Sequence, residues 1–292
     1  MSTPNIHHFF HRPTFTFAYV VSDPATKQCV VIDSVLDYNQ AAARTSSGFA
    51  DEIIEYISEH ELSLQWILET HAHADHITAS HYLKEKLGGQ IGIGARISEV
   101  QKIFKDLYNL EDSFQPDGSQ FDRLFQQGDE FSIGELSFSV METPGHTPAC
   151  ITYIVDNHHA FIGDTLFMPD YGTARCDFPG GSAETLYDSI QKIYALGDDT
   201  QLLMCHDYRP DAPSPRWLTT VKQEKAHNPL IQEGVTKQMY AKARETIDKV
   251  LSAPKLILPA LQINIRAGAL PPAESNGISY LKSPLNQLGK QE

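Results

Sequence analysis

The segment Thr70-His71-Ala72-His73-Ala74-Asp75-His76 contains four side chains of the kinds that bind metal ions. The apolar run before it, residues 64–69, predicts a strand. Residues 77–87, which end at Gly88-Gly89, predict a helix. The four side chains therefore lie in a tight turn, where they can converge on one point. Imidazole and carboxylate groups suit zinc, iron and manganese, so the segment predicts a metal site without choosing the metal.

A search for further ligands finds three more, each shortly after a predicted strand: His146 after residues 138–142, Asp164 after residues 160–163 and His206 after residues 202–205. His71 also comes just after its strand. Side chains at strand ends collect in pockets, because the sheet holds them rigidly while the neighbouring turns stay open to a ligand. We therefore expect these four residues to share one site.

The composition of the 292-residue chain argues against several kinds of partner. Apolar residues make up 41% and charged residues 21%, which is ordinary for a globular protein of one large domain or two small ones. A formal net charge of −14 argues against nucleic acid and against anionic membrane surfaces, because both attract positive charge. A small anionic substrate is compatible with this charge, since a metal ion and one or two arginines can reverse the local field.

Cysteine usage predicts the compartment. The four cysteines are Cys29, Cys150, Cys176 and Cys205, and no two are spaced as C-x-x-C. This usage is typical of reduced intracellular proteins. The first residues contain no basic region followed by an apolar run, and no apolar run is long enough to cross a bilayer. We expect a soluble cytoplasmic protein, and the sequence leaves open whether it forms a homo-oligomer.

The chain changes character near residue 209. Residues 1–209 are expected to form the catalytic domain, and residues 210–292 an extension packed on the same domain. The extension opens with a proline-rich link and ends in a tail with recurring prolines and weak periodicity. Periodicity predicts the other elements: a hairpin over 14–33, helices over 49–60, 98–108, 183–196, 219–227 and 235–251, a loop over 111–129 and a hairpin over 131–142.

The sequence allows two interpretations for each of two groups of polar residues. Asp33 and Asp37 follow the second strand of the first hairpin, and they either support the metal site from behind the ligands or lie on the surface as loop acids. Residues 6–11 contain three histidines and form either a metal-binding tract or an opening strand with exposed imidazoles. We favour the strand, because a metal-binding assignment here depends on composition alone.

Four motifs together resemble the metallo-β-lactamase superfamily in composition and order: His71-Ala72-His73-Ala74-Asp75-His76, Pro144-Gly145-His146-Thr147, Gly163-Asp164-Thr165-Leu166-Phe167 and Cys205-His206-Asp207-Tyr208. The resemblance spans residues 14 to about 209. It implies an α/β protein with a four-layer αββα sandwich and a metal site at one edge of the two sheets. Residues 210–292 would then be a helical and irregular C-terminal extension.

Within the superfamily, residues Pro169 to Gly181 look like the bacterial second type of persulfide dioxygenase, often called β-lactamase hydrolase-like. The tail segment from Leu261 to Pro272 is similar to the same group. Glyoxalase II and the mitochondrial type of persulfide dioxygenase usually carry a Gly-Cys-Gly-Arg-like segment where this chain has Tyr171 to Arg175. Only the arginine matches, so their substrate contacts do not transfer directly.

The resemblance implies one Fe(II) ion per chain, held by His71, His146 and Asp164 as a two-histidine, one-carboxylate set. The other polar residues of the motifs would then surround these ligands: His73, Asp75, His76 and His206. In the dinuclear zinc hydrolases of the superfamily the same residues bind metal directly. The sequence retains all of them, so a site with two metal ions stays open.

The leading hypothesis is oxidation of glutathione persulfide by O2 and water to glutathione and sulfite, in which both atoms of O2 are transferred to the terminal sulfur. Arg175 is the predicted contact for a glutathione carboxylate, because a guanidinium binds a carboxylate through two parallel hydrogen bonds. An ion pair between Arg175 and Asp177 explains the same arginine equally well.

Two other functions compete with this hypothesis. The first is a dinuclear zinc hydrolase of a thioester or lactone, similar to glyoxalase II, in which Asp75 orients a hydroxide and Asp164 bridges two ions. The second is a non-catalytic sensor of metal or reactive sulfur, with Cys176 and Cys205 as its modifiable thiols. For both cysteines we favour a buried packing role, because free cysteine is usually buried.

Overall fold

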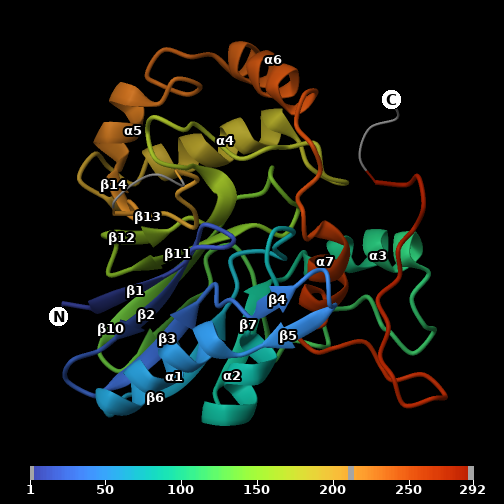
Figure 1. Ribbon diagram of the computed structural model, residues 1–292. Helices are drawn as coiled ribbons and strands as arrows, with labels where there is room; N and C mark the ends of the chain where they lie inside the picture. The colour runs from blue at the N-terminus through green and yellow to red at the C-terminus, as the bar shows by residue number, and fades with distance from the viewer. Residues whose placement is uncertain (1–2, 210–213, 289–292) are drawn as a thin grey trace.

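Two six-stranded sheets lie face to face at the centre of the fold (Figure 1). The computed structural model describes residues 3–209 and 214–288. The first sheet has the order β1 (Asn5–His11), β2 (Thr16–Ser22), β3 (Gln28–Ile32), β6 (Ser63–Leu68), β7 (Gln90–Gly94) and β8 (Arg123–Phe125). The second has the order β14 (Leu218–Thr220), β13 (Gln201–Leu203), β12 (His159–Phe161), β11 (Ile151–Val155), β10 (Leu136–Glu142) and β9 (Glu130–Ile133).

Alternation along β2 shows how the sequence builds the layers. Phe17, Tyr19 and Val21 point into the apolar core between the two sheets. Ala18 and Val20 point the other way, into the core under the helices of the first sheet. Successive side chains of a strand face opposite sides, so an unbroken apolar strand has to be covered on both faces.

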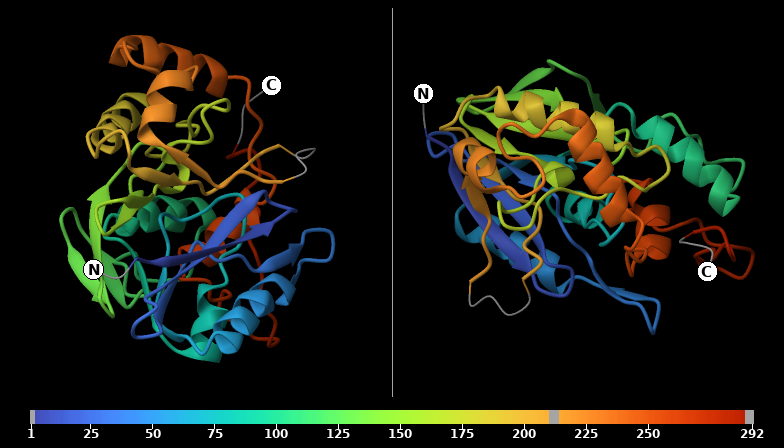
Figure 2. Two further views of the ribbon diagram at one scale, coloured as in Figure 1. Left: turned by 90° about the vertical axis from the view of Figure 1, so that its left-hand side faces the viewer. Right: turned by 90° about the horizontal axis from the view of Figure 1, so that it is seen from above.

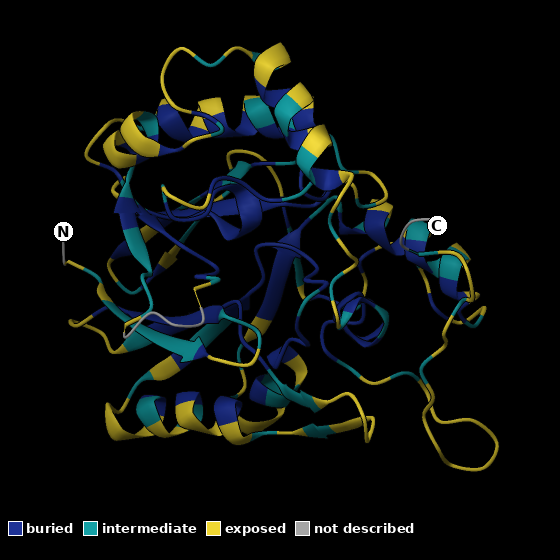
Figure 3. Cartoon of the chain, turned by 45° about the horizontal axis from the view of Figure 1, so that its top comes forward, coloured by how far each residue is buried: buried dark blue, intermediate teal, exposed yellow. Residues whose placement is uncertain are grey.

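Helices supply the two outer layers (Figures 1 and 2). Below the first sheet in Figure 1 lie α1 (Gly48–Glu59) and α2 (Ser80–Leu87). Above the second sheet lie α4 (Ala183–Tyr194), α5 (Val221–His227) and α6 (Lys237–Asp248), and at one end α3 (Ile97–Tyr108) packs beside α7 (Ile257–Asn264). Figure 3 shows their inner faces buried and their outer faces exposed. This confirms the predicted αββα sandwich.

Most predicted elements agree with the structure. The predicted hairpin over 14–33 is confirmed, because β2 and β3 pair antiparallel. The opening segment is confirmed as a strand, β1, but the prediction that its imidazoles are exposed is wrong, because His7 and His8 are half-buried and His11 is buried beside Asp37. The predicted helix over 49–60 is α1, which buries Ile53 and Ile57. The helical spacing of these apolar residues is a local pattern, and the folded structure keeps the helix that this pattern predicts.

Four predicted segments differ from the structure. Residues 77–79 are not helical, because Ile77 bridges to Leu36, and α2 begins at Ser80. The predicted helix over 219–227 is β14 as far as Thr220, which pairs with β13, and α5 after it. The predicted loop over 111–129 contains β8, and the tail contains α7. In the first three cases a strand or residue distant in sequence pairs with the segment and decides its structure.

The C-terminal extension supplies parts of the layers already described. β14 is an edge strand of the second sheet, and α5 and α6 lie on the outer face of that sheet. Residues 210–213 of the predicted proline-rich link lie outside the described residues. A small two-stranded sheet, β4 (Asp37–Asn39) and β5 (Arg44–Ser46), projects beside α7 (Figure 1). Among the described residues, no helix combines the length and apolarity that crossing a membrane requires.

Candidate metal centre

In two histidines, His71 and His146, one ring nitrogen has a hydrogen-bond partner in the protein and the other points toward Asp164. His71, in the turn after β6, has its Nδ1 atom 3.0 Å from the Thr70 hydroxyl oxygen. His146, in the turn after β10, donates from Nδ1 to the Arg175 carbonyl oxygen at 2.8 Å. The Nε2 atoms lie 3.9 and 3.8 Å from the same oxygen, Oδ2 of Asp164. Both rings are thus oriented toward one carboxylate.

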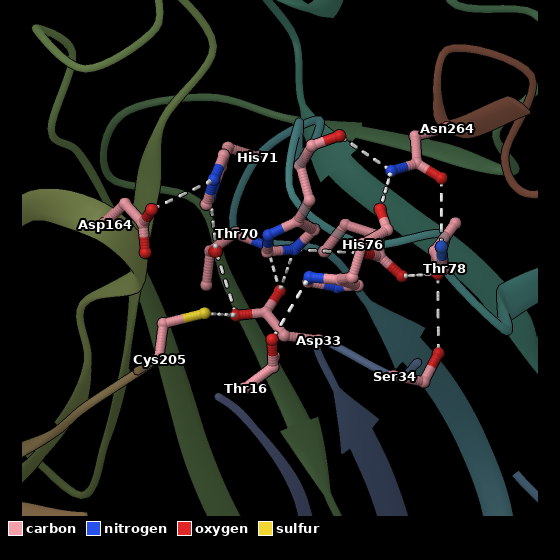
Figure 4. Close-up of polar contacts among 12 residues, drawn as sticks. Thr16, Asp33, Ser34, Thr70, His71, His76, Thr78, Asp164, Cys205 and Asn264 are labelled. Carbon is pink, nitrogen blue, oxygen red and sulfur yellow. Dashed lines mark hydrogen bonds and ion pairs between the residues drawn. The ribbon is translucent and has the colours of Figure 1, made fainter. Parts of the chain in front are cut away.

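Asp164 reaches this position from a short 3-10 turn, Gly163–Thr165, that follows β12. Gly163 has φ of +51°, and a Cβ atom there would lie 2.6 Å from the Thr70 hydroxyl oxygen. Only glycine fits this close approach without strain. The turn therefore brings the Asp164 carboxylate of the second sheet against the His71 turn of the first sheet (Figure 4).

The donor set fits a metal ion. One ligand atom each from His71, His146 and Asp164 lies within 4.8 Å of the others. The three residues are buried, yet the Nε2 atom of His71 has no hydrogen-bond partner. A buried polar atom without a partner is costly, and a cation at this point would remove the cost. Burial lowers the pKa of His71 well below its ordinary value, so the ring is neutral and can bind metal.

A second group of possible ligands adjoins the first. The Nε2 atom of His206 lies 3.2 Å from Oδ1 of Asp164 and 3.4 Å from Oδ2 of Asp75. His76 faces Asp75 through Nδ1 at 3.5 Å, and its Nε2 atom is buried without a hydrogen-bond partner. Because Asp164 contacts both groups, a second ion beside the first is compatible with this arrangement.

His73 is held differently from the other histidines of the cluster. Its Nε2 atom lies 3.1 Å from Asp33 and 3.3 Å from Glu69, while its Nδ1 atom is buried without a partner. Burial acts to lower the pKa of His73, but the Asp33 and Glu69 carboxylates raise it well above its ordinary value. His73 therefore balances two buried carboxylates behind the ligand turn, residues 69–79 between β6 and α2.

Asp33 and Asp37, for which the sequence left two interpretations, have different roles in the structure. Asp33 is buried, accepts hydrogen bonds from the Thr70 amide and hydroxyl groups at 2.8 and 2.9 Å, and so supports the residue that orients His71 (Figure 4). Asp37 accepts a hydrogen bond from the Phe49 amide at 2.8 Å and lies 3.1 Å from the His11 ring. Asp37 thus forms its hydrogen bonds with the start of α1 and with His11, and not with the ligand turn.

Sequence reasoning assigned no role to three residues of this network. Thr70 orients His71, and Glu69 accepts hydrogen bonds from the hydroxyl groups of Thr78 and Ser80. Asn264 contacts the backbone of the ligand turn from α7. Thr70 and Glu69 adjoin the histidine cluster in sequence and could have been suspected. Asn264 lies almost 200 residues away.

A cavity of about 930 Å³ opens over the candidate metal ligands His146 and Asp164. His146, Asp164, Asp75 and His76 contribute to its wall, together with aromatic side chains and residues of the C-terminal extension. Cationic side chains also line it: Arg175, Arg244 and Lys255. A cavity of this size can hold a small-molecule substrate.

Of the two roles predicted for Arg175, the structure contains the ion pair with Asp177. Its Nε and Nη2 atoms donate to the Asp177 carboxylate at 2.6 and 2.8 Å, and Nη1 donates to the Ser252 carbonyl oxygen at 2.7 Å. Arg175 is also one of the residues that line the cavity. A substrate carboxylate would therefore have to share Arg175 with Asp177.

The two cysteines of the sensor hypothesis are buried. Burial raises the pKa of Cys176 and of Cys205 above the ordinary value, so both thiols stay protonated at neutral pH. Cys205 lies beneath the site, with Sγ 3.8 Å from Oδ2 of Asp33. Buried, protonated thiols fit a packing role, because the thiolate is the reactive form.

Residues 11–206 match the model of the metallo-beta-lactamase superfamily, and the chain belongs to this superfamily of metal-binding enzymes, which act on small molecules. The chain is 51% identical to "Glyoxylase B2" of Dictyostelium discoideum over 92% of both chains. It is 50% identical to the "Beta-lactamase hydrolase-like protein" of Agrobacterium fabrum over 98% of this chain, but it spans only 66% of that protein.

More distant relatives are persulfide dioxygenases. The chain is 30% identical to "Persulfide dioxygenase ETHE1, mitochondrial" of Homo sapiens, over 90% of this chain and 88% of the human one. The crystal structure of ETHE1 from Myxococcus xanthus superposes with a TM-score of 0.72 at 30% identity, covering 91% of this chain and all of that chain. These similarities confirm the resemblance inferred from the motifs.

Proposed function

We propose that the chain is an iron-dependent persulfide dioxygenase. The reaction converts glutathione persulfide, O2 and water to glutathione, sulfite and two protons, which balances in sulfur, oxygen and hydrogen. Fe(II) would supply the redox chemistry with O2, and His71, His146 and Asp164 would hold it. The observation that carries the proposal is this set of two imidazoles and one carboxylate at the base of the cavity.

The protein residues would place the persulfide. Thr70 and the Arg175 carbonyl oxygen keep the Nε2 atoms of His71 and His146 directed at the ion, which fixes the ligand geometry before substrate arrives. The cavity is large enough for glutathione, and Arg175 is the proposed contact for one of its carboxylates. Phe167 and Phe178 line the cavity and make part of its wall apolar.

Oxygen uptake tests the proposal. Protein loaded with one iron per chain is mixed with glutathione persulfide, while dissolved O2 and sulfite are followed. We expect one O2 consumed and one sulfite formed for each persulfide. Protein with iron confirmed at one ion per chain and no uptake above the uncatalysed rate would contradict the dioxygenase.

A dinuclear zinc hydrolase is the second candidate function. It is favoured by the group of Asp75, His76 and His206 beside Asp164, and by the name "Glyoxylase B2" of a relative at 51% identity. In that case the second group would hold a second ion, and Asp75 would orient the attacking water. Two zinc ions per chain and rapid thioester hydrolysis without O2 uptake would support it over the dioxygenase.

A further inference from the structure

Asn264, the last residue of α7, binds the backbone of the ligand turn at three points (Figure 4). Its Nδ2 atom donates to the carbonyl oxygens of His73 and His76, both at 2.8 Å. Its Oδ1 atom accepts from the Thr78 amide at 2.9 Å. The side chain is buried, so water does not compete for these bonds.

These bonds matter because the ligand turn lies between β6 and α2 and belongs to neither. The carbonyl oxygens of His73 and His76 therefore cannot be paired within a sheet or a helix, and a buried backbone group needs a partner. One primary amide supplies two donors and one acceptor, which is what the two carbonyl oxygens and the Thr78 amide require. The turn that carries four possible ligands thus has its shape set by a residue of the C-terminal extension.

The segment around Asn264 is itself firmly anchored. The Gln101 side chain donates to the Ile265 carbonyl oxygen at 2.9 Å. Arg266 forms a two-point ion pair with Glu111 at 2.7 and 2.9 Å. At Gly268, where φ is +87°, a Cβ atom would lie 3.2 Å from the Thr78 carbonyl oxygen, so the backbone passes close to the turn. Asn264 therefore projects from a rigid support.

We propose that Asn264 is a positioning residue for the metal centre. It holds residues 73–78, and with them the Asp75 and His76 side chains that adjoin the group of His71, His146 and Asp164, and it makes the C-terminal extension part of the site. The inference requires a metal site at His71, His146 and Asp164, but it holds for iron and for zinc. It therefore does not depend on which of the two candidate functions is correct.

A matched pair of substitutions tests the inference. Asn264→Asp keeps the shape and the acceptor for Thr78 but replaces the amide donor with a second oxygen, which repels the two carbonyl oxygens. The control is Gln262→Glu on the same helix. Gln262 is equally buried, but its amide bonds Leu258 and Lys282, away from the ligand turn. Both substitutions convert a buried amide to a carboxyl group, so general destabilisation affects both.

Metal affinity is measured by competition with a chelator, first with Zn2+ alone and then with Fe2+ alone. We expect Asn264→Asp to weaken binding at least tenfold, and Gln262→Glu to weaken it less than threefold, because partners that orient ligands affect affinity by 10–100-fold. Equal weakening in the two variants, or none in Asn264→Asp, would overturn the inference. Oxygen uptake is not used, so this result is separate from the test of the dioxygenase.

Hydrogen exchange of the metal-free wild-type chain gives a test that needs no variant to fold. If Asn264 holds the turn, the Thr78 amide, which donates to Asn264 Oδ1, should be protected as strongly as the amides of α7, and both should lose protection together as denaturant is added. Exchange of the Thr78 amide that is at least tenfold faster than in α7 would show that Asn264 does not hold the turn.

Discussion

Both oxygens of the Asp33 carboxylate accept hydrogen bonds from Thr70, one from its amide at 2.8 Å and one from its hydroxyl group at 2.9 Å. The Thr70 hydroxyl oxygen lies 3.0 Å from Nδ1 of His71. A residue on the loop after β3 thereby controls the orientation of a predicted metal ligand after β6. This link between neighbouring parallel strands leads to the first prediction.

Asp33→Asn should weaken metal binding by roughly 10–100-fold, because loss of the carboxylate disturbs Thr70 and removes a negative charge from His73. Asp37→Asn is the control, since Asp37 bonds α1 and His11 and does not contact the ligand turn. Its effect on metal affinity should be less than threefold. Chelator competition on both variants measures this, and similar losses would refute a specific role for Asp33.

His146→Ala should abolish both metal binding at the three-residue site and catalytic turnover, because it removes one of three ligands. His11→Ala provides the comparison: His11 is a buried histidine that lines the same cavity but faces Asp37. That variant should keep at least half of the bound metal. Elemental analysis measures the metal content of both variants. Full metal content and activity in His146→Ala would show that the ligand assignment is wrong.

Arg175→Ala should raise KM for glutathione persulfide about tenfold, equivalent to about 1.4 kcal/mol, with little change in kcat. The His146 ring is held by the Arg175 backbone, so the substitution leaves that bond available. Asp177→Asn removes the competing carboxylate and should not raise KM. Steady-state kinetics distinguish the roles, because an equal rise in both variants would mean that Arg175 acts only through its ion pair.

Gly163→Ala should disrupt the metal centre, since the added Cβ would lie 2.6 Å from the Thr70 hydroxyl oxygen. Gly197→Ala is the matched control, because Gly197 also has positive φ, at +111°, but no atom lies within 4 Å of its added Cβ. The control should lose about 1–2 kcal/mol of stability and keep its metal. Thermal unfolding and metal content test both. Normal metal binding in Gly163→Ala would contradict the close approach.

Glu224 should make stability depend on pH. Burial raises its pKa to about 8, despite the hydrogen bond that its carboxyl group accepts from Asn228 at 2.7 Å. In the unfolded chain the carboxyl group loses its proton near pH 4.5. Between these values the folded state binds more protons than the unfolded state, so stability falls as pH rises from about 4.5 to 8.

Glu224→Gln should remove this contribution. Its stability relative to the wild type should therefore increase between pH 5 and pH 9, by at most roughly 1.4 kcal/mol per pH unit across the window. Chemical denaturation of both proteins at pH 5, 7 and 9 provides the measurement. A constant difference between them at the three values would refute the shifted pKa.

The layers of the fold were readable from local pattern. The β-branched and aromatic residues of Thr16–Ser22 predict a strand and the spacing of Ile53 and Ile57 predicts a helix, because both are local patterns of residue type. The structure also brings His71, His146 and Asp164 together, as expected from their positions after strand ends. The sequence motifs, through their resemblance to a known superfamily, thus implied the αββα fold and the candidate ligand set.

Tertiary structure alone decided what surrounds those ligands. Asn264 contacts the carbonyl oxygen of His73 across 191 residues, and Asp33 contacts Thr70 across 37. Arg175 was predicted to contact substrate or Asp177, and only the folded chain shows its hydrogen bonds to Asp177 and Ser252. Hydrogen bonds between distant segments have no periodic signal in sequence, because they depend on where the packed layers bring each side chain.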